Sequence, residues 1–132
     1  MSALRTPLVS KFLLISLILV GLSSISIVKA AKSFYIIGDT GTWGFLEQYS
    51  AWAFKKPFVA GDVVVFRYPA TVHNTVRVSV SGYDSCVATE AESKKALWTG
   101  DDRYSLKKGY NYFICGIGGH CNAGMKIKIF AK

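Results

Sequence analysis

A glycine-rich loop between two apolar segments constrains the fold of this chain more than any other feature. The run Cys115-Gly-Ile-Gly-Gly-His120-Cys-Asn-Ala-Gly-Met125 follows the β-patterned segment 110–114 and precedes 126–130, in which lysines alternate with isoleucines. Glycine lets the backbone turn sharply, so this loop can double back between two strands. We therefore expect the side chains of Cys115, His120 and Met125 to point at one place at the end of a sheet.

Other short β-patterned segments occur along the chain and are separated by turn residues. Apolar and polar side chains alternate over 75–80, as is typical of a half-buried strand. Lys107-Lys108-Gly109 has the composition of a hairpin turn between two strands. The segments predicted to be strands are 33–37, 63–68, 75–80, 103–106, 110–115 and 126–130.

Helical signals are few. Glu47 to Phe54 can form a short helix, and Thr89-x-x-Glu92 resembles a capping box that begins one or two helical turns toward Ala96. Many short strands in about a hundred residues predict an all-β domain, a β-sandwich or small barrel, with one or two short helices.

Residues 1–30 have the organisation of a secretory signal peptide. Arg5 and Lys11 form a positively charged region before the apolar stretch 12–22. Val28-Lys29-Ala30 then places small residues at the spacing of a cleavage site. A signal anchor or transmembrane helix is the alternative, but the apolar core is shorter than the roughly 20 residues that a membrane span needs. We predict cleavage after Ala30, a single domain over 31–132, and secretion to the extracellular space. Since no apolar tail ends the sequence, no lipid anchor is expected.

The charge of the chain is basic and evenly spread. Loss of the first thirty residues lowers the basic residues from 16 to 13 against 8 acidic residues, which leaves a net charge of +5. The chain contains no block of five or six like charges, so we do not expect a nucleic-acid-binding tail. A moderate positive field suits acidic cell-wall polymers or an anionic redox partner, and a solvated basic surface explains the same pattern.

Three cysteines in a secreted chain leave one thiol without a disulfide partner. Cys121 adjoins His120, and in an extended stretch these two side chains point to opposite sides. This favours a Cys86–Cys121 disulfide and a free Cys115. Pairing of Cys115 with either other cysteine remains an alternative, and it would leave His120 and Met125 without a thiolate nearby.

A free thiol, two histidines and one methionine after the initiator make up a small set of possible metal ligands. The second histidine is His73, which precedes a valine-rich segment. A thiolate, two imidazoles and a weak axial thioether are the ligands of blue-copper electron-transfer sites. A structural zinc site is the chief competitor, but it more often has paired Cys-x-x-Cys or His-x₃-His spacing and no methionine. We therefore hypothesise one copper ion, cycling between Cu(I) and Cu(II), on His73, Cys115, His120 and Met125.

The chain resembles the phytocyanins, a family of secreted plant cupredoxins, over residues 32–132. The resemblance rests on the segments Ala60-Gly61-Asp62-Val63, His73-Asn74, Tyr112-Phe113-Ile114-Cys115, Gly119-His120-Cys121 and Gly124-Met125-Lys126-Ile127. It implies a cupredoxin-like Greek-key β-sandwich, copper on His73, Cys115, His120 and Met125, and a Cys86–Cys121 disulfide. Methionine in the axial place resembles the plantacyanin, or basic blue, branch and not the stellacyanins, which carry glutamine there.

One position departs from the family pattern. Phytocyanins usually have proline where this chain has Gly118. Glycine lacks the φ restriction that proline supplies, so we expect the loop to be looser when metal is absent.

The resemblance implies a monomeric, non-enzymatic one-electron carrier of the apoplast or cell wall. A single metal site with no spare histidine excludes multicopper oxidase chemistry, and no Ser/His/Asp triad or paired catalytic carboxylate is evident. In cupredoxins electrons are thought to pass through the loop histidine, here His120 beside Ile117 and three glycines. The alternative is an extracellular matrix or cell-signalling protein of plant reproduction or the cell wall, in which copper is secondary. The redox partner is not identified by the sequence.

Overall fold

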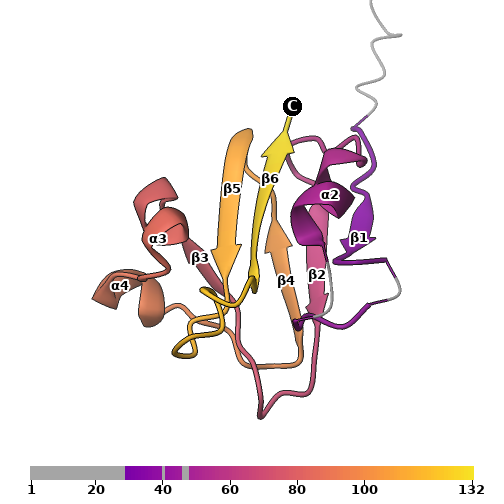
Figure 1. Ribbon diagram of the computed structural model, residues 1–132. Helices are drawn as coiled ribbons and strands as arrows, with labels where there is room; N and C mark the ends of the chain where they lie inside the picture. The colour runs from indigo at the N-terminus through magenta and orange to yellow at the C-terminus, as the bar shows by residue number, and fades with distance from the viewer. Residues whose placement is uncertain (1–28, 40, 46–47) are drawn as a thin grey trace, which may run out of the picture. The chain divides into compact units, whose positions relative to one another are not determined.

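Two three-stranded β-sheets form the body of the domain (Figure 1). The first sheet has the order β1 (Phe34–Ile36), β2 (Val63–Arg67), β4 (Asp101–Ser105), with β1 parallel and β4 antiparallel to β2. The second sheet is antiparallel and has the order β3 (Val76–Val78), β5 (Gly109–Ile114), β6 (Lys126–Ala131). The all-β prediction is confirmed, and each predicted strand is present with slightly different ends.

The structure is a computed structural model that describes residues 29–39, 41–45 and 48–132. Residues 32–132 form one compact unit. The predicted signal peptide, residues 1–30, lies almost entirely outside the described residues and stays a prediction. In the part of the chain that the structure describes, no helix has both the length and the apolar character needed to cross a membrane.

Among the described residues, three short helices accompany the sheets. α2 (Tyr49–Phe54) packs against β6 and lies within the predicted helical segment. α4 (Glu90–Ser93) begins at the predicted capping box, in which the Glu92 backbone N–H donates to Thr89 Oγ1 at 3.2 Å and the Thr89 N–H donates to Glu92 Oε2 at 2.7 Å. Both helix predictions are therefore confirmed.

α3 (Val80–Ser85) was not predicted from the sequence. The alternating pattern over 75–80 predicts a longer strand, but β3 ends at Val78. Ser79 caps the new helix, since its Oγ accepts a hydrogen bond from the Gly82 N–H at 3.1 Å. This cap satisfies the Gly82 backbone N–H in the first turn of α3, so the helix begins at Val80 although the alternation of apolar and polar residues continues to that position.

The predicted hairpin at Lys107-Lys108-Gly109 is wrong. β4 pairs with β2, and β5 pairs with β3 and β6, so this turn leads from one sheet to the other. Asn111 closes the turn: its Oδ1 accepts from the Lys107 N–H at 2.9 Å and its Nδ2 donates to the Lys107 carbonyl at 2.8 Å. A side chain, and not a strand ladder, therefore satisfies the backbone of this connection.

The core lies between the two sheets. Phe66 of β2 and Phe113 of β5 are fully buried, and their ring centroids lie 5.2 Å apart. Trp43 adds an edge-on contact with Phe66 at 4.9 Å. Each such buried side chain contributes about 1.5–3 kcal/mol to folding. Cys115 and Met125 belong to the same core cluster, so the core fixes the base of the loop that joins β5 to β6.

Candidate metal centre

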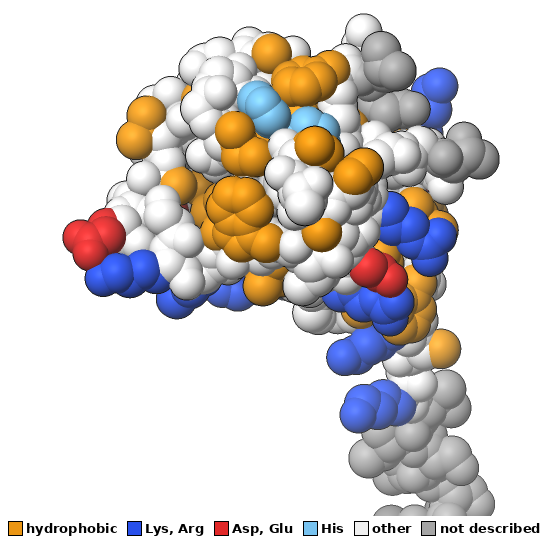
Figure 2. Space-filling view, turned by 90° about the horizontal axis from the view of Figure 1, so that it is seen from below, with side chains coloured by type: hydrophobic (Ala, Val, Ile, Leu, Met, Phe, Trp, Pro, Cys, Tyr) orange, Lys and Arg blue, Asp and Glu red, His pale blue; other side chains and the backbone are white. Residues whose placement is uncertain are grey.

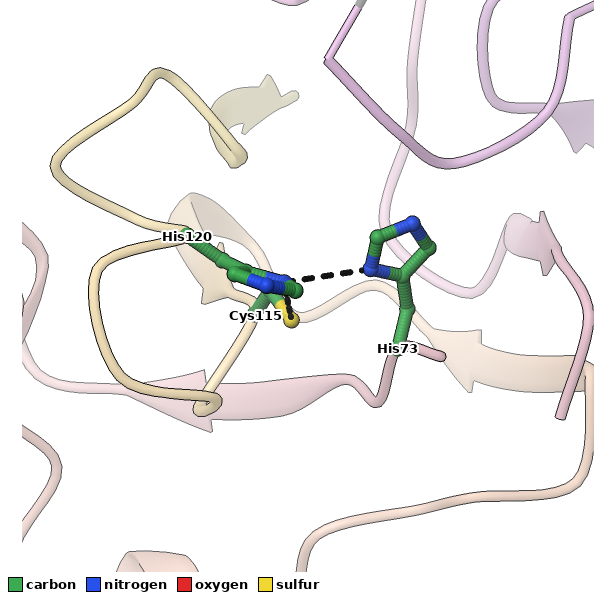
Figure 3. Close-up of side chains that lie close together, drawn as sticks. All are labelled: His73, Cys115 and His120. Carbon is green, nitrogen blue, oxygen red and sulfur yellow. Dashed lines mark hydrogen bonds between the residues drawn. The ribbon is translucent and has the colours of Figure 1, made fainter. Parts of the chain in front are cut away.

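His73, Cys115 and His120 converge at the end of the domain where β5 ends and β6 begins. The Nδ1 atoms of the two histidines lie 3.2 Å apart, and Cys115 Sγ lies 3.4 Å from His120 Nδ1 (Figure 3). One ligand atom from each of the three residues lies within 4.8 Å of the others. His73 is more than forty positions from Cys115 and His120 in the sequence, yet the three side chains meet at one point.

The loop from 115 to 125 is held in turns by its own backbone. The Cys115 N–H donates to the Met125 carbonyl at 3.0 Å, and the Met125 N–H donates to the His120 carbonyl at 3.0 Å. Gly119 and Gly124 have φ values of +83° and +106°, which side-chain-bearing residues rarely adopt. The glycines therefore permit the sharp turn that the sequence predicts.

Asn74 fastens the His73 segment to this loop. Its side chain is buried, and Asn74 Oδ1 accepts a hydrogen bond from the Gly116 N–H at 2.6 Å. Its carbonyl accepts from Trp43 Nε1 at 3.0 Å. A Cβ added at Gly116 would lie 2.9 Å from Val76 Cγ2, so the close approach depends on glycine. The sequence did not reveal this role, although a polar residue directly after a candidate ligand is a signal to consider.

A buried polar network supports the other side of His73. Asp102 of β4 is buried and accepts hydrogen bonds from Thr75 Oγ1 and Thr99 Oγ1, both at 2.6 Å, and from the Tyr68 hydroxyl. Burial, and then the Asp102 carboxylate, raise the pKa of Tyr68 well above its ordinary value. Tyr68 and Thr75 stand on either side of His73 in the sequence, so this network anchors both ends of the segment that presents His73.

Burial favours the metal-binding protonation state of His73. Cys115 is 1% exposed, whereas His73 and His120 are partly buried. Burial lowers the pKa of His73, and the neighbouring His120 lowers it further. The neutral imidazole, which is the form that binds metal, is therefore the form favoured at His73.

The arrangement fits a single metal ion. Three donors around one ion, at bond lengths of about 2.0–2.3 Å as for zinc, lie roughly 3.5–4 Å from one another. The separations of 3.2 Å between the two Nδ1 atoms and 3.4 Å between Cys115 Sγ and His120 Nδ1 are close to this range, so small side-chain adjustments are sufficient. Two imidazole nitrogens and one sulfur form a donor set suited to copper in both of its oxidation states.

Met125 lies beside these residues as the sequence predicts, and its side chain is completely buried. Its backbone is hydrogen-bonded to Cys115 and to His120. Met125 directly precedes β6, and Ile127 and Ile129 of that strand are buried as well, in agreement with the parity expected of a strand. A role for its sulfur as the axial donor stays a prediction.

Cys86 and Cys121 form a disulfide, with a Cα–Cα distance of 5.5 Å, and Cys115 is a free, buried thiol. Neither alternative pairing is present. Cys121 lies in a turn and not in the extended stretch that the sequence argument assumed. The disulfide ties the metal-ligand loop to the end of α3, where Cys86 adopts the left-handed conformation with φ of 56°.

An apolar surface surrounds the two histidines. Figure 2 shows both histidine side chains at the surface, among hydrophobic side chains, with lysine, arginine and acidic side chains toward the edge of this face. The Phe45 ring lies 5.6 Å from the His73 ring and 4.9 Å from the His120 ring, and it is 51% exposed. The sequence predicted an apolar residue, Ile117, near His120. It did not predict Phe45, because no periodicity or spacing links Phe45 to the histidines.

Comparison with known proteins places this geometry in a family. A family model described as a plastocyanin-like domain matches residues 43–125, a range that contains all four candidate ligands. A chemocyanin from Lilium longiflorum is 46% identical over 97 residues, 74% of each chain, and a basic blue protein from Arabidopsis thaliana is 40% identical over 104 residues, 79% of this chain and 76% of the relative. The chain belongs to the phytocyanin family.

Solved structures of other phytocyanins have the same fold as this chain. The cucumber basic protein, a blue copper protein, superposes with a TM-score of 0.69 at 37% identity and covers 76% of this chain and 100% of its own. Spinach plantacyanin superposes with a TM-score of 0.65 at 42% identity, with the same coverage. The predicted cupredoxin-like fold is therefore confirmed.

Proposed function

We propose that this phytocyanin is a secreted, mononuclear type 1 copper protein that acts as a one-electron carrier. The observation that supports this function best is the convergence of His73 Nδ1, Cys115 Sγ and His120 Nδ1 within 4.8 Å. Bound copper supplies a one-electron couple between Cu(I) and Cu(II).

Each residue of the cluster has a separate role in this proposal. His73 and His120 provide neutral imidazole nitrogens. Cys115 provides a thiolate, and its burial keeps other thiols from reacting with it. Met125 would provide a weak axial sulfur that tunes the reduction potential without creating the site. The disulfide and the Asn74–Gly116 hydrogen bond hold the ligand segments in place, so little structural change need accompany electron transfer.

The apolar face around the histidines is the proposed docking surface for a redox partner. His120 is partly buried, and its ring contacts the exposed Phe45 ring. A partner with an apolar patch could approach His120 closely, which shortens the electron path. Since His73, Cys115 and His120 are the only candidate metal cluster among the described residues, we propose a carrier and not an enzyme.

A matrix-binding or signalling role in the plant cell wall or in reproduction, with copper secondary, is the second candidate. A cationic, aromatic groove on the same domain, formed in part by Tyr110 and Lys128, favours it. Reduction of the copper protein by small donors, compared with capture from cell-wall extracts, separates the two roles.

Copper loading of the protein over 31–132 tests the main proposal. We expect Cu(II) to give intense visible absorption from sulfur-to-copper charge transfer, and ascorbate to bleach it reversibly. Zinc gives neither effect because its d shell is filled. Cys115→Ser should abolish the colour, whereas Met125→Gln should retain it and lower the reduction potential. A colourless Cu(II) complex of the intact protein would contradict electron transfer.

A further inference from the structure

α2 lies beside the end of β6 that is farther from the metal centre (Figure 1). Residues of α2, β5 and β6 line a hollow at this end of the domain. Its volume is about 530 Å³, within the size range of small-molecule and oligomer sites. Tyr110 in its wall is five residues before Cys115 on β5, which corresponds to roughly 17 Å along a strand. The groove is thus separate from the metal centre.

The groove is lined by aromatic side chains that are exposed to solvent. Phe54 is 93% exposed, Tyr110 57% and Phe130 52%. The Tyr110 and Phe130 ring centroids lie 5.0 Å apart. Large apolar side chains gathered around a hollow on the surface of a domain mark an interaction site more often than isolated exposed ones do.

A row of rings extends from the groove along the outer face of the second sheet. Tyr110 lies 6.1 Å from Tyr112, and Tyr112 lies 5.4 Å from Tyr83 of α3. Alternation along β5 places Tyr110 and Tyr112 on this face, and alternation along β6 places Phe130 there. We call Phe130, Tyr110, Tyr112 and Tyr83 the aromatic row. Its length suits an elongated ligand better than a compact one.

Lysines accompany the row without acidic partners. Lys128 Nζ lies 5.1 Å above the Tyr110 ring, and Lys126 Nζ lies 4.6 Å above the Tyr83 ring. Lys132 and Lys56 also line the groove, and no aspartate or glutamate side chain does. Lys56 is paired with Asp39 at 2.8 Å, whereas Lys126, Lys128 and Lys132 form no salt bridge among the described residues. The row therefore presents positive charges that an anionic ligand would neutralise.

From these observations we propose that the groove and the aromatic row bind an acidic polysaccharide, a chain of uronic-acid sugars. The apolar C–H faces of sugar rings stack on exposed aromatic rings, and sugar carboxylates pair with lysines at charge-assisted hydrogen-bond distance. A polymer can place successive sugars along Phe130, Tyr110 and Tyr112 while Lys128 and Lys132 meet its carboxylates. This site is independent of copper, so the metal end stays free while the groove is occupied.

Binding of the copper-loaded protein to polygalacturonate, measured by affinity electrophoresis and calorimetry at about 0.15 M salt, tests the proposal. We expect Tyr110→Ala and Lys128→Ala each to weaken binding at least about tenfold, and Tyr110→Phe to retain it because the ring is kept. Arg67→Ala is the matched charge control, since Arg67 is exposed at the end of β2 in the other sheet. It should change binding less than about twofold.

Three results would overturn the proposal. Equal weakening by Arg67→Ala and Lys128→Ala would show unspecific charge attraction. Equal binding of neutral dextran would show that the lysines do not select a polysaccharide that carries carboxylates. Binding to vesicles of phosphatidylserine and phosphatidylcholine, without binding to polygalacturonate, would assign the groove to membranes. The visible absorption of every variant is recorded alongside, so loss of the copper site and loss of the polysaccharide site remain distinguishable.

Discussion

The two ends of the β5–β6 pair are assembled in different ways. At the metal end, the ligand atoms come from separate segments: the Asn74–Gly116 hydrogen bond joins the His73 segment to the ligand loop, and the Cys86–Cys121 disulfide ties that loop to α3. At the groove end, Tyr110 and Phe130 share a face because side chains alternate along neighbouring strands. The metal end therefore depends on long-range constraints, whereas the groove end depends on strand parity.

The surfaces of the two ends differ as well. The histidines of the metal end are surrounded by hydrophobic side chains, with charged side chains at the edge of the face (Figure 2). The groove end combines exposed rings with Lys128 and Lys132. Two partners of different chemistry, one apolar and one anionic, can therefore be served by one small domain without competing for the same surface.

Removal of the disulfide should have the largest effect and should act through the metal end. Cys86 and Cys121 are 35 positions apart, and the chain-entropy model gives about 3–4 kcal/mol for a loop of this length. We expect the double variant Cys86→Ala with Cys121→Ala to lose that much free energy of unfolding in copper-free denaturant titrations. Binding of polygalacturonate by the folded fraction should be unchanged. A loss below about 1 kcal/mol would show that the disulfide does not constrain the unfolded chain in this way.

Two buried asparagines, one at each end, allow a matched test. Asn74→Ala leaves the Gly116 N–H without its acceptor, and Asn111→Ala removes the bonds that close the 107–109 turn. Each change should cost about 1–3 kcal/mol in the free energy of unfolding, as expected for a buried group left unsatisfied. Only Asn74→Ala should shift the visible band and weaken copper retention against a chelator. An equal spectral shift in Asn111→Ala would show that the two ends are coupled.

Much of the metal centre follows from residue identity alone. The chain has two histidines, so a site with two imidazoles must use His73 and His120, and the odd cysteine count requires a free thiol. The parity of Ile127 and Ile129 likewise predicted that Met125, directly before β6, is buried, and its side chain is buried. The convergence of His73, Cys115 and His120 and the burial of Met125 agree with this reasoning, which depends on composition and on local periodicity. Copper ligation by these residues stays a prediction.

The features that the sequence did not predict depend on contacts between distant segments. Phe45 meets both histidines and Asn74 reaches Gly116, yet neither residue has a periodic signal that links it to its partner. The hairpin prediction at 107–109 failed for a related reason. Chain adjacency favours pairing of successive strands, but β2 already pairs with β4, and β3 and β6 flank β5.

The smallest effect is expected at Gly118, where the resemblance to the phytocyanins implies that proline is usual and where only the metal end is involved. A Cβ added at Gly118 would have no heavy atom within 4 Å, and Gly118 is not among the glycines with positive φ. Proline at a compatible position stabilises a protein by about 0.4–1 kcal/mol because it restricts the unfolded chain. We expect Gly118→Pro to raise the free energy of unfolding of the copper-free protein by this amount.

Gly118→Ala serves as the control, since it adds the Cβ without closing the ring and should give only part of the gain. Chemical unfolding of the copper-free proteins measures the difference between the two variants. The visible spectrum and polygalacturonate binding should match those of the original chain, because Gly118 is exposed and is neither a candidate ligand nor part of the groove. Destabilisation by proline but not by alanine would show that the backbone at 117–118 lies outside the φ and ψ range that proline requires, and the loop would then owe its shape to glycine itself.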